Sequence, residues 1–126
     1  MDDDEIFLQA LTNKLSQTHD VIALTSIGEV EQFLSQDPAP VDGFFVDLEM
    51  PDEGGVLWPL GGLSTIRVIR NHASYKEQLV AVLTGREADV NAVMCLKNGA
   101  DDFIVKSISV AETAEDIERV LHHRVA

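Results

Sequence analysis

The chain has 126 residues, 45% of them apolar, with nine basic and 22 acidic residues and a formal net charge of −13. This length and apolar content suffice for one domain with one hydrophobic core, so we expect a single domain over residues 1–126. The acidic charge repels nucleic-acid phosphates and anionic lipids, and the sequence contains no basic cluster that would offset it. We therefore expect neither nucleic acid nor a membrane among its partners.

Targeting signals and cysteine usage favour a cytoplasmic protein. No stretch approaches the ~20 apolar residues of a membrane span, and the acidic start at residues 1–5 differs from the basic start of a secretory signal. The single cysteine, Cys95, cannot form an internal disulfide, which is compatible with a reducing compartment.

Apolar residues alternate between helical spacing and short continuous runs, the pattern of a parallel sheet covered by helices. A first helix is predicted after Asp3 or Asp4, and a short strand at about residues 21–24. The predicted inward face of this helix is Ile6, Phe7, Ala10, Leu11 and Leu15. The Ser-x-x-Glu pattern at Ser26–Glu29 predicts a capping box that opens a second helix.

The rest of the chain continues the alternation, which makes four strands and five helices in total. The predicted elements are, in order, a strand over 43–46, an irregular Gly-rich segment over 49–62, a helix over 63–71, a strand over 79–83, a helix over 87–98 closed by Gly99, a strand over 102–105 and a helix from Ser109 towards His122. The chain opens in a helix where such a fold should open in a strand.

Candidate functional residues lie at the ends of the predicted strands. Asp47, Thr84 and Lys106 each follow a buried strand, and Asp2 and Asp3 precede the first helix. Because parallel α/β sheets place their functional groups at the carboxyl ends of strands, these side chains are expected to gather at one edge.

Four ordered segments resemble the response-regulator receiver family of two-component signalling. They are Asp2-Asp3-Asp4-Glu5, Val46-Asp47-Leu48-Glu49-Met50-Pro51, Leu83-Thr84-Gly85 and the run from Lys97 to Lys106. The resemblance implies a doubly wound parallel sheet of flavodoxin-like order. It also implies a signalling module, not an enzyme, that a histidine kinase or histidine phosphotransfer protein phosphorylates and that acts on a downstream protein.

The resemblance also implies a role for each site residue. Asp47 would be the phosphoacceptor, attacking a phosphohistidine or acyl phosphate. Lys106 and the hydroxyl of Thr84 would bind phosphoryl oxygens, and Phe103 would be the aromatic switch that follows Thr84. The implied ligands of Mg²⁺ are Asp2, Asp3, Asp47 and the backbone carbonyl of Glu49.

Each of these residues has a simpler interpretation. Acidic residues such as Asp2 and Asp3 favour any helix N-terminus, and Phe103 fits a plain core position. Lys106 fits a solvated lysine, and Thr84 fits a hydroxyl at the end of a strand.

The sequence departs from the family at three places. The first strand is missing, since only Met1 precedes Asp2. Three arrangements would complete the sheet: residues upstream of Met1 supply the missing strand, the two neighbouring strands pair directly, or residues 56–60 or a second chain fill the position of the missing strand. With a second chain, the result would be a homodimer or strand-swapped assembly. The segment between Asp47 and Thr84 is about two helical turns longer than usual, and Ser107 replaces the usual proline.

Two other functions compete with phosphotransfer. A pseudo-receiver would keep the fold as a non-phosphorylated binding or dimerisation module, which the missing strand and Phe103 favour. An aspartate-nucleophile phosphohydrolase would need a second aspartate two residues after Asp47, where Glu49 stands.

Overall fold

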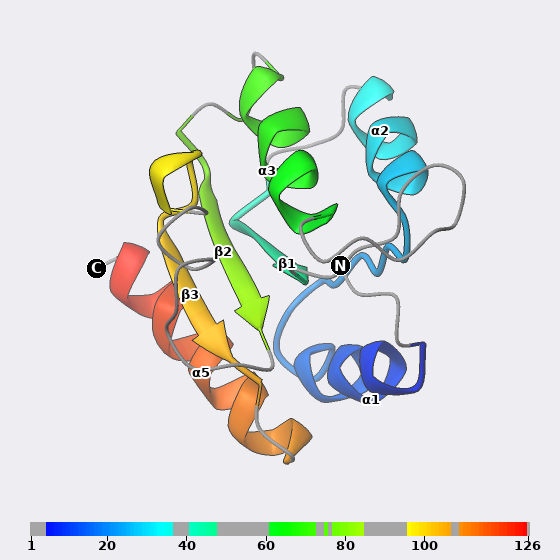
Figure 1. The fold of residues 1–126 in the computed structure, drawn as a ribbon. Coiled ribbons are helices and arrows are strands. Elements are labelled where there is room, and N and C mark those ends of the chain that lie inside the picture. The colour runs from blue at the N-terminus through cyan, green and yellow to red at the C-terminus, as the bar shows by residue number, and fades with distance from the viewer. Residues whose placement is uncertain are drawn as a thin grey trace.

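The structure is a computed structural model that describes residues 5–36, 41–47, 61–72, 75, 77–84, 96–106 and 109–125. Its elements are α1 (Glu5–Leu15), α2 (Ile27–Ser35), β1 (Gly43–Asp47), α3 (Gly61–Asn71), β2 (Leu79–Thr84), β3 (Asp102–Val105) and α5 (Val110–Val125). The described strands form one parallel sheet in the order β1-β2-β3, as Figure 1 shows. The predicted α/β class with a parallel sheet is therefore confirmed.

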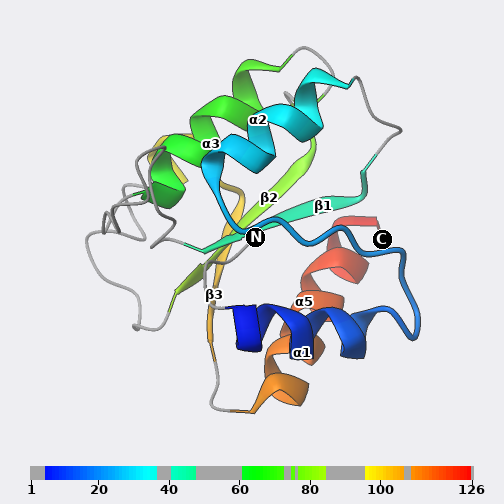
Figure 2. The ribbon, with the colours of Figure 1, turned by 90° about the vertical axis from the view of Figure 1, so that its right-hand side faces the viewer.

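Helices cover both faces of the sheet, which gives three layers (Figure 2). On one face α2 and α3 pack against alternate residues of the strands, among them Phe44, Val46, Val80 and Val82. On the other face α1 and α5 pack against each other and against Leu83. All six residues of β2 are buried, as expected for the central strand of a sheet covered on both sides.

The prediction of a strand at residues 21–24 is wrong. Residues 20–25 are described as irregular backbone, and Ile22 is 61% exposed. A strand requires a hydrogen-bonded neighbour, and the described sheet ends at β1, which pairs with β2 alone. The described residues therefore also exclude the direct joining of this segment to β1.

The inward face of α1 was predicted in part. Leu11 and Leu15 are buried and Phe7 is half-buried, as expected, and Leu8 joins them. Ile6 is 85% exposed and Ala10 is also exposed, so both were placed on the wrong face. With about 100° of rotation per residue, Ile6 lies nearly opposite the stripe of residues 8, 11 and 15 that meets the sheet and α5.

Both predicted helix starts are confirmed. The hydroxyl of Ser26 accepts a hydrogen bond from the backbone N–H of Glu29 at 3.2 Å, and that of Ser109 accepts one from Glu112 at 3.4 Å. The carboxylate of Glu29 accepts from the backbone N–H of Thr25 at 2.6 Å and from its hydroxyl at 2.7 Å. These bonds, the backbone one first, lower the pKa of Glu29 below 4.5.

Gly99 ends its helix in the left-handed region, with φ at 114°, as the sequence predicts for a C-terminal glycine. A Cβ at this position would lie 3.0 Å from Cγ of Arg70. The Arg70 guanidinium donates to the backbone carbonyls of Gly99, Tyr75 and Gln78 and pairs with Asp101 at 2.9 Å. This network fixes the ends of α3, β2 and β3 that lie opposite the candidate site.

Several predicted features lie outside the described residues. They are the capping residues before α1, the Gly-rich segment at 49–60, most of the helix over 87–98, Cys95 and Ser107. Among the described helices, none combines the length and the apolar composition that a membrane span requires.

Candidate functional site

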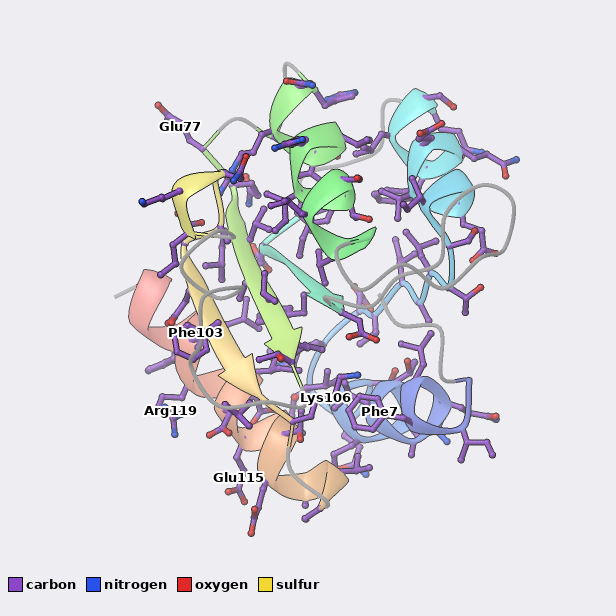
Figure 3. The ribbon with its side chains drawn as sticks, viewed as in Figure 1. Phe7, Glu77, Phe103, Lys106, Glu115 and Arg119 are labelled. Carbon is purple, nitrogen blue, oxygen red and sulfur yellow. The ribbon has the colours of Figure 1, made fainter. Side chains whose placement is uncertain are left out.

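The carboxyl ends of the strands meet at one edge of the sheet. Asp47 is the last residue of β1 and lies in register with Leu83, and Thr84, the next residue, is in register with Val105. Lys106 follows β3 directly. Because all strands run parallel, the side chains at their ends share this edge, and Figure 3 shows Lys106 there.

Asp47 and Lys106 form an ion pair. The distance from Nζ of Lys106 to Oδ2 of Asp47 is 3.2 Å, with 6% of the Asp47 side chain and 21% of the Lys106 side chain exposed. A buried carboxylate is costly without a charged or hydrogen-bonding partner, and the ammonium supplies one. The sequence places each residue at a strand end, and the folded sheet brings the two together.

The backbone holds Lys106 beside β2. Its N–H donates to the carbonyl of Thr84 at 2.6 Å, which continues the ladder between β2 and β3 one residue past the strand. Thr84 is buried, with 7% of its surface exposed. The pairing therefore fixes where the lysine side chain leaves the sheet, next to the threonine.

Phe7 is a member of this site that the sequence did not indicate. Nζ of Lys106 lies 5.0 Å from the centroid of the Phe7 ring, within the range of a cation–π contact. The ring comes from the first turns of α1, and Figure 3 shows it next to Lys106. The helical spacing predicted only that Phe7 faces inward, because the partner lies almost the whole chain away.

The predicted metal ligands are mostly outside the described residues. Asp2, Asp3 and Glu49 are not described, and Asp47 is. In the described part of the chain, no three His, Cys, Asp or Glu side chains group closely enough to hold a metal ion. Carboxylate and carbonyl oxygens, the donors predicted here, are the ligands that Mg²⁺ prefers.

Phe103 lies in β3 and is half-buried, packed against the core cluster shared by the sheet, α2 and α3. The simpler interpretation of this residue, a core position, agrees with that packing.

Chemically, the site pairs a carboxylate with an ammonium at the open end of a parallel sheet, one residue from a hydroxyl side chain. An ammonium and a hydroxyl suit the oxygens of a tetrahedral anion, and a carboxylate is a competent nucleophile towards phosphorus. The class of protein that this fold and site define is the receiver module of a signalling pathway.

The comparison with known families agrees with this class. The family described as response regulator receiver domain matches residues 1–118, and the chain belongs to that family. It is thus a receiver domain of two-component signal transduction, and not a catalytic enzyme.

Individual relatives are similar over nearly the whole chain. The sensory transduction protein BceR of Halalkalibacterium halodurans is 28% identical over 123 residues, covering 96% of this chain and 48% of that protein. The chain therefore spans about half the length of the curated relatives it matches.

Solved structures show the same fold. A response regulator from Thermotoga maritima is 26% identical with a TM-score of 0.72, covering 97% of this chain and 93% of the other. A response regulator from Burkholderia pseudomallei, solved with a phosphorylated aspartic acid, a calcium ion and citrate, is 23% identical with a TM-score of 0.69, covering 94% and 68%. The predicted flavodoxin-like receiver fold is confirmed by these neighbours.

Proposed function

We propose that this chain receives a phosphoryl group on Asp47 from a histidine kinase or histidine phosphotransfer protein. The observation that carries the proposal is the pairing of a buried carboxylate with the Lys106 ammonium at the carboxyl edge of the sheet. The Burkholderia pseudomallei relative supports it, since that structure holds a phosphorylated aspartic acid.

In this proposal each residue has one task. The Asp47 carboxylate attacks phosphorus of a phosphohistidine or acyl phosphate, and an aspartyl phosphate forms as the bond to the donor breaks. Lys106 then pairs with a phosphoryl oxygen as a point charge, and the Thr84 hydroxyl donates to another.

Receivers typically bind Mg²⁺, and the residues of this chain suit it. Asp2, Asp3, Asp47 and the carbonyl of Glu49 would hold the ion, which supplies positive charge next to the transferring phosphoryl group. Lys106 contacts Oδ2 of Asp47, so the other carboxylate oxygen is the one we assign to the ion.

The signal to a downstream protein would start at the same edge of the sheet. We assign residues 1–126 to one receiver domain that signals through contacts with a downstream protein in the cytoplasm, with Thr84 and Phe103 as the switch pair. The surface formed by β3, α5 and the segment before Gly99 is the one that such a switch would alter.

A pseudo-receiver is the second candidate. Phe103 already packs against the core cluster, and phenylalanine has no hydroxyl to hold an outward position. In this alternative the fold binds a partner constitutively and Asp47 stays unmodified.

The experiment that decides is phosphorylation by acetyl phosphate with Mg²⁺, followed by intact-mass measurement. The wild-type chain should gain one phosphoryl group, and Asp47→Asn should gain none. Asp42→Asn is the matched control, because Asp42 is an exposed aspartate next to the other end of the same strand. Labelling that persists in Asp47→Asn would sink the assignment of the acceptor, and a wild-type chain that neither labels nor binds beryllofluoride would favour the pseudo-receiver.

A further inference from the structure

The side chain of Lys106 has to cross the end of β2 to reach Asp47. Lys106 follows β3, Asp47 ends β1, and β2 lies between these two strands. Because neighbouring strands lie about 4.8 Å apart, the two residues belong to backbones separated by about 10 Å. The stem of the lysine must therefore stay extended for its ammonium to lie 3.2 Å from Oδ2 of Asp47.

The sheet fixes only one end of this stem. The backbone N–H of Lys106 donates to the carbonyl of Thr84 at 2.6 Å, so the side chain leaves the backbone from a set place. The other end carries the ammonium, and rotation about the bonds of the stem would carry it away from Asp47, because an unrestrained lysine samples many rotamers. The ring of Phe7 lies 5.0 Å from that ammonium. Together with Asp47, the ring is thus placed to restrain the end of the stem that the sheet does not hold.

The packing of the helices sets the position of the Phe7 ring. Phe7 is half-buried and packs against the core cluster that α1 and α5 share with the sheet, which includes Leu83 of β2 and Ile104 of β3. Figure 3 shows the side chains of Phe7 and Lys106 next to each other, one from α1 and the other from the end of β3. The ring therefore has a fixed base in the core, and the flexible lysine has not.

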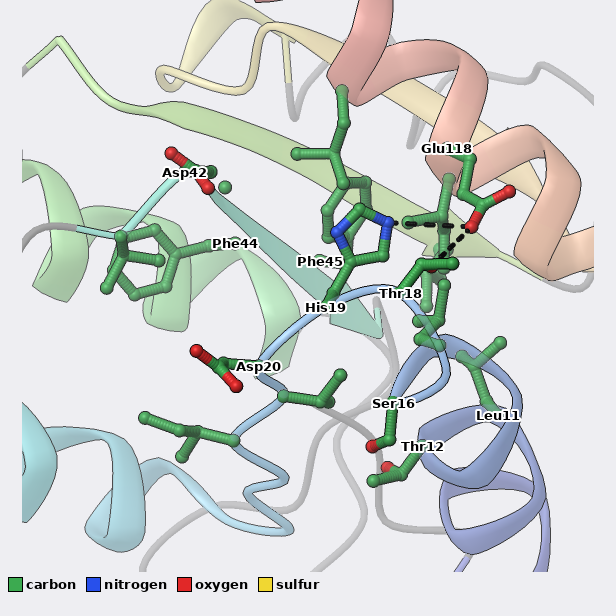
Figure 4. Close-up of a pocket in the computed structure, with 18 of the residues that line it drawn as sticks. Leu11, Thr12, Ser16, Thr18, His19, Asp20, Asp42, Phe44, Phe45 and Glu118 are labelled. Carbon is green, nitrogen blue, oxygen red and sulfur yellow. Dashed lines mark hydrogen bonds and ion pairs between the residues drawn. The ribbon is translucent and has the colours of Figure 1, made fainter.

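Polar contacts also tie α1 to α5. The segment that follows α1 reaches α5, where the Glu118 carboxylate accepts a hydrogen bond from the Thr18 hydroxyl at 3.0 Å and lies 3.5 Å from Nε2 of His19 (Figure 4). Together with the packing of α1 on α5, these contacts limit how far α1 can rotate about its axis. Because Phe7 belongs to the first turns of α1, they also limit where its ring can lie.

An aromatic ring suits this position better than a second acidic group. The face of a ring attracts an ammonium through its quadrupole, and the attraction is stronger where water is partly excluded, as it is for Lys106, 21% of whose side chain is exposed. The ring has no formal charge, so the ammonium keeps the positive charge that stabilises a phosphoryl oxygen. A carboxylate at the same place would hold the lysine but would cancel that charge.

We propose that Phe7 is a positioning residue for phosphoryl transfer, and that its ring keeps the Lys106 ammonium extended over Asp47, where it meets the oxygens of the incoming phosphoryl group. This inference rests on the proposed function. In the step itself the Asp47 carboxylate forms a bond to phosphorus while the bond from phosphorus to the donor breaks, and with acetyl phosphate the departing group is acetate. Lys106 keeps its protons throughout. An ammonium already in place saves the entropy that fixing a mobile lysine would cost during transfer.

The test is the rate at which the full chain gains a phosphoryl group from acetyl phosphate with Mg²⁺, followed as intact mass over time. Phe7→Leu removes the ring but keeps an apolar side chain for the core cluster, and should slow labelling roughly two- to fivefold, the effect expected of a partly exposed cation–π contact. Phe7→Tyr keeps the ring and should recover most of the wild-type rate. Equal slowing by these two variants would overturn the proposal.

A double-mutant cycle shows whether Phe7 acts through Lys106. In a Lys106→Met chain, whose labelling is followed over a longer time, Phe7→Leu should cause no further slowing, because the ring has no ammonium left to position. Slowing by the same factor in both backgrounds would overturn the proposal, since the ring would then act through the fold alone. Phe33→Leu, the same change on the other face of the sheet, should leave the rate unchanged.

A measurement without donor or Mg²⁺ separates this inference from the proposed function. An aromatic ring shifts the proton NMR resonances of groups that lie over its face, so the ε-methylene protons of Lys106 should lie upfield of their usual position in the wild type and return to it in Phe7→Leu. Resonances at the usual position in a wild-type chain that labels normally would overturn the positioning role and leave the proposed function intact. A wild-type chain that gains no phosphoryl group would overturn the proposed function, and with it any role of Phe7 in transfer, whatever the resonances show.

Discussion

Nζ of Lys106 lies 3.2 Å from Oδ2 of Asp47 and 5.0 Å from the centroid of the Phe7 ring. The ammonium is thus held between a carboxylate at the end of β1 and an aromatic ring at the start of α1. Side chains of lysine have several rotatable bonds, so two contacts on one ammonium reduce the entropy lost when a third, anionic group binds.

Phe7→Leu should therefore weaken the binding of beryllofluoride, a mimic of the phosphoryl group. We expect the affinity to fall by roughly two- to fivefold, which corresponds to the free energy of a cation–π contact near a surface. Lys106→Met, which removes the charge itself, should weaken it by about 100-fold. The measurement is titration of beryllofluoride in the presence of Mg²⁺.

Phe33→Leu is the matched control for this prediction. Phe33 is also half-buried on a helix, but it packs in the core cluster on the other face of the sheet. If Phe33→Leu weakens binding as much as Phe7→Leu does, the effect is general loosening of the fold and not positioning of Lys106.

Glu29 should make the stability of α2 depend on pH. Its folded-state pKa is below 4.5 because the ionised carboxylate accepts hydrogen bonds from Thr25, the backbone N–H contributing most. Because the pKa is lower in the folded state, the ionised carboxylate stabilises the fold at pH values above the pKa of the unfolded state. This stabilisation is lost as the pH falls through the pKa of the folded state. Because the site is exposed, Glu29→Gln should lower the free energy of unfolding at pH 7 by only about 0.5 kcal/mol.

The pH dependence is the discriminating measurement. In urea unfolding of both proteins, the difference between wild type and Glu29→Gln should shrink as the pH is lowered below 4.5. Glu31→Gln, a neighbouring exposed change on the same helix, should show little difference at any pH. A difference for Glu29→Gln that stays constant down to low pH would mean that the charge is not what matters.

Arg70 should be a major contributor to stability, far from the proposed site. Its guanidinium donates to three backbone carbonyls and pairs with Asp101, whose carboxylate also accepts from the N–H of Val80 at 2.9 Å. Arg70→Met leaves these acceptors unsatisfied and should cost about 3 kcal/mol in urea unfolding.

Arg119→Met is the comparison for this prediction. Arg119 pairs with Asp116 at 2.7 Å along α5, but 73% of its side chain is exposed, so the loss should be under about 0.5 kcal/mol. Equal losses for the two arginines would contradict the structural assignment of Arg70.

The elements with strong local signals were predictable. The strands ending at Asp47 and Thr84 are continuous apolar runs, and the helices beginning at Ile27 and Val110 follow a serine whose hydroxyl caps the first turn. Gly99 marked the end of a helix because only glycine adopts its backbone conformation without strain. These signals act within a few residues, so the sequence by itself determined them.

What only the tertiary structure decided depends on contacts between distant residues. The segment at 21–24 has the composition of a strand but no hydrogen-bonded neighbour in the described sheet, so it stays irregular and borders a groove. Ile6 matched the helical period but faces solvent, because packing against α5 and the sheet sets the rotation of α1. Phe7 meets Lys106 for the same reason: the approach of the two residues is a property of how the layers stack, and no local pattern encodes it.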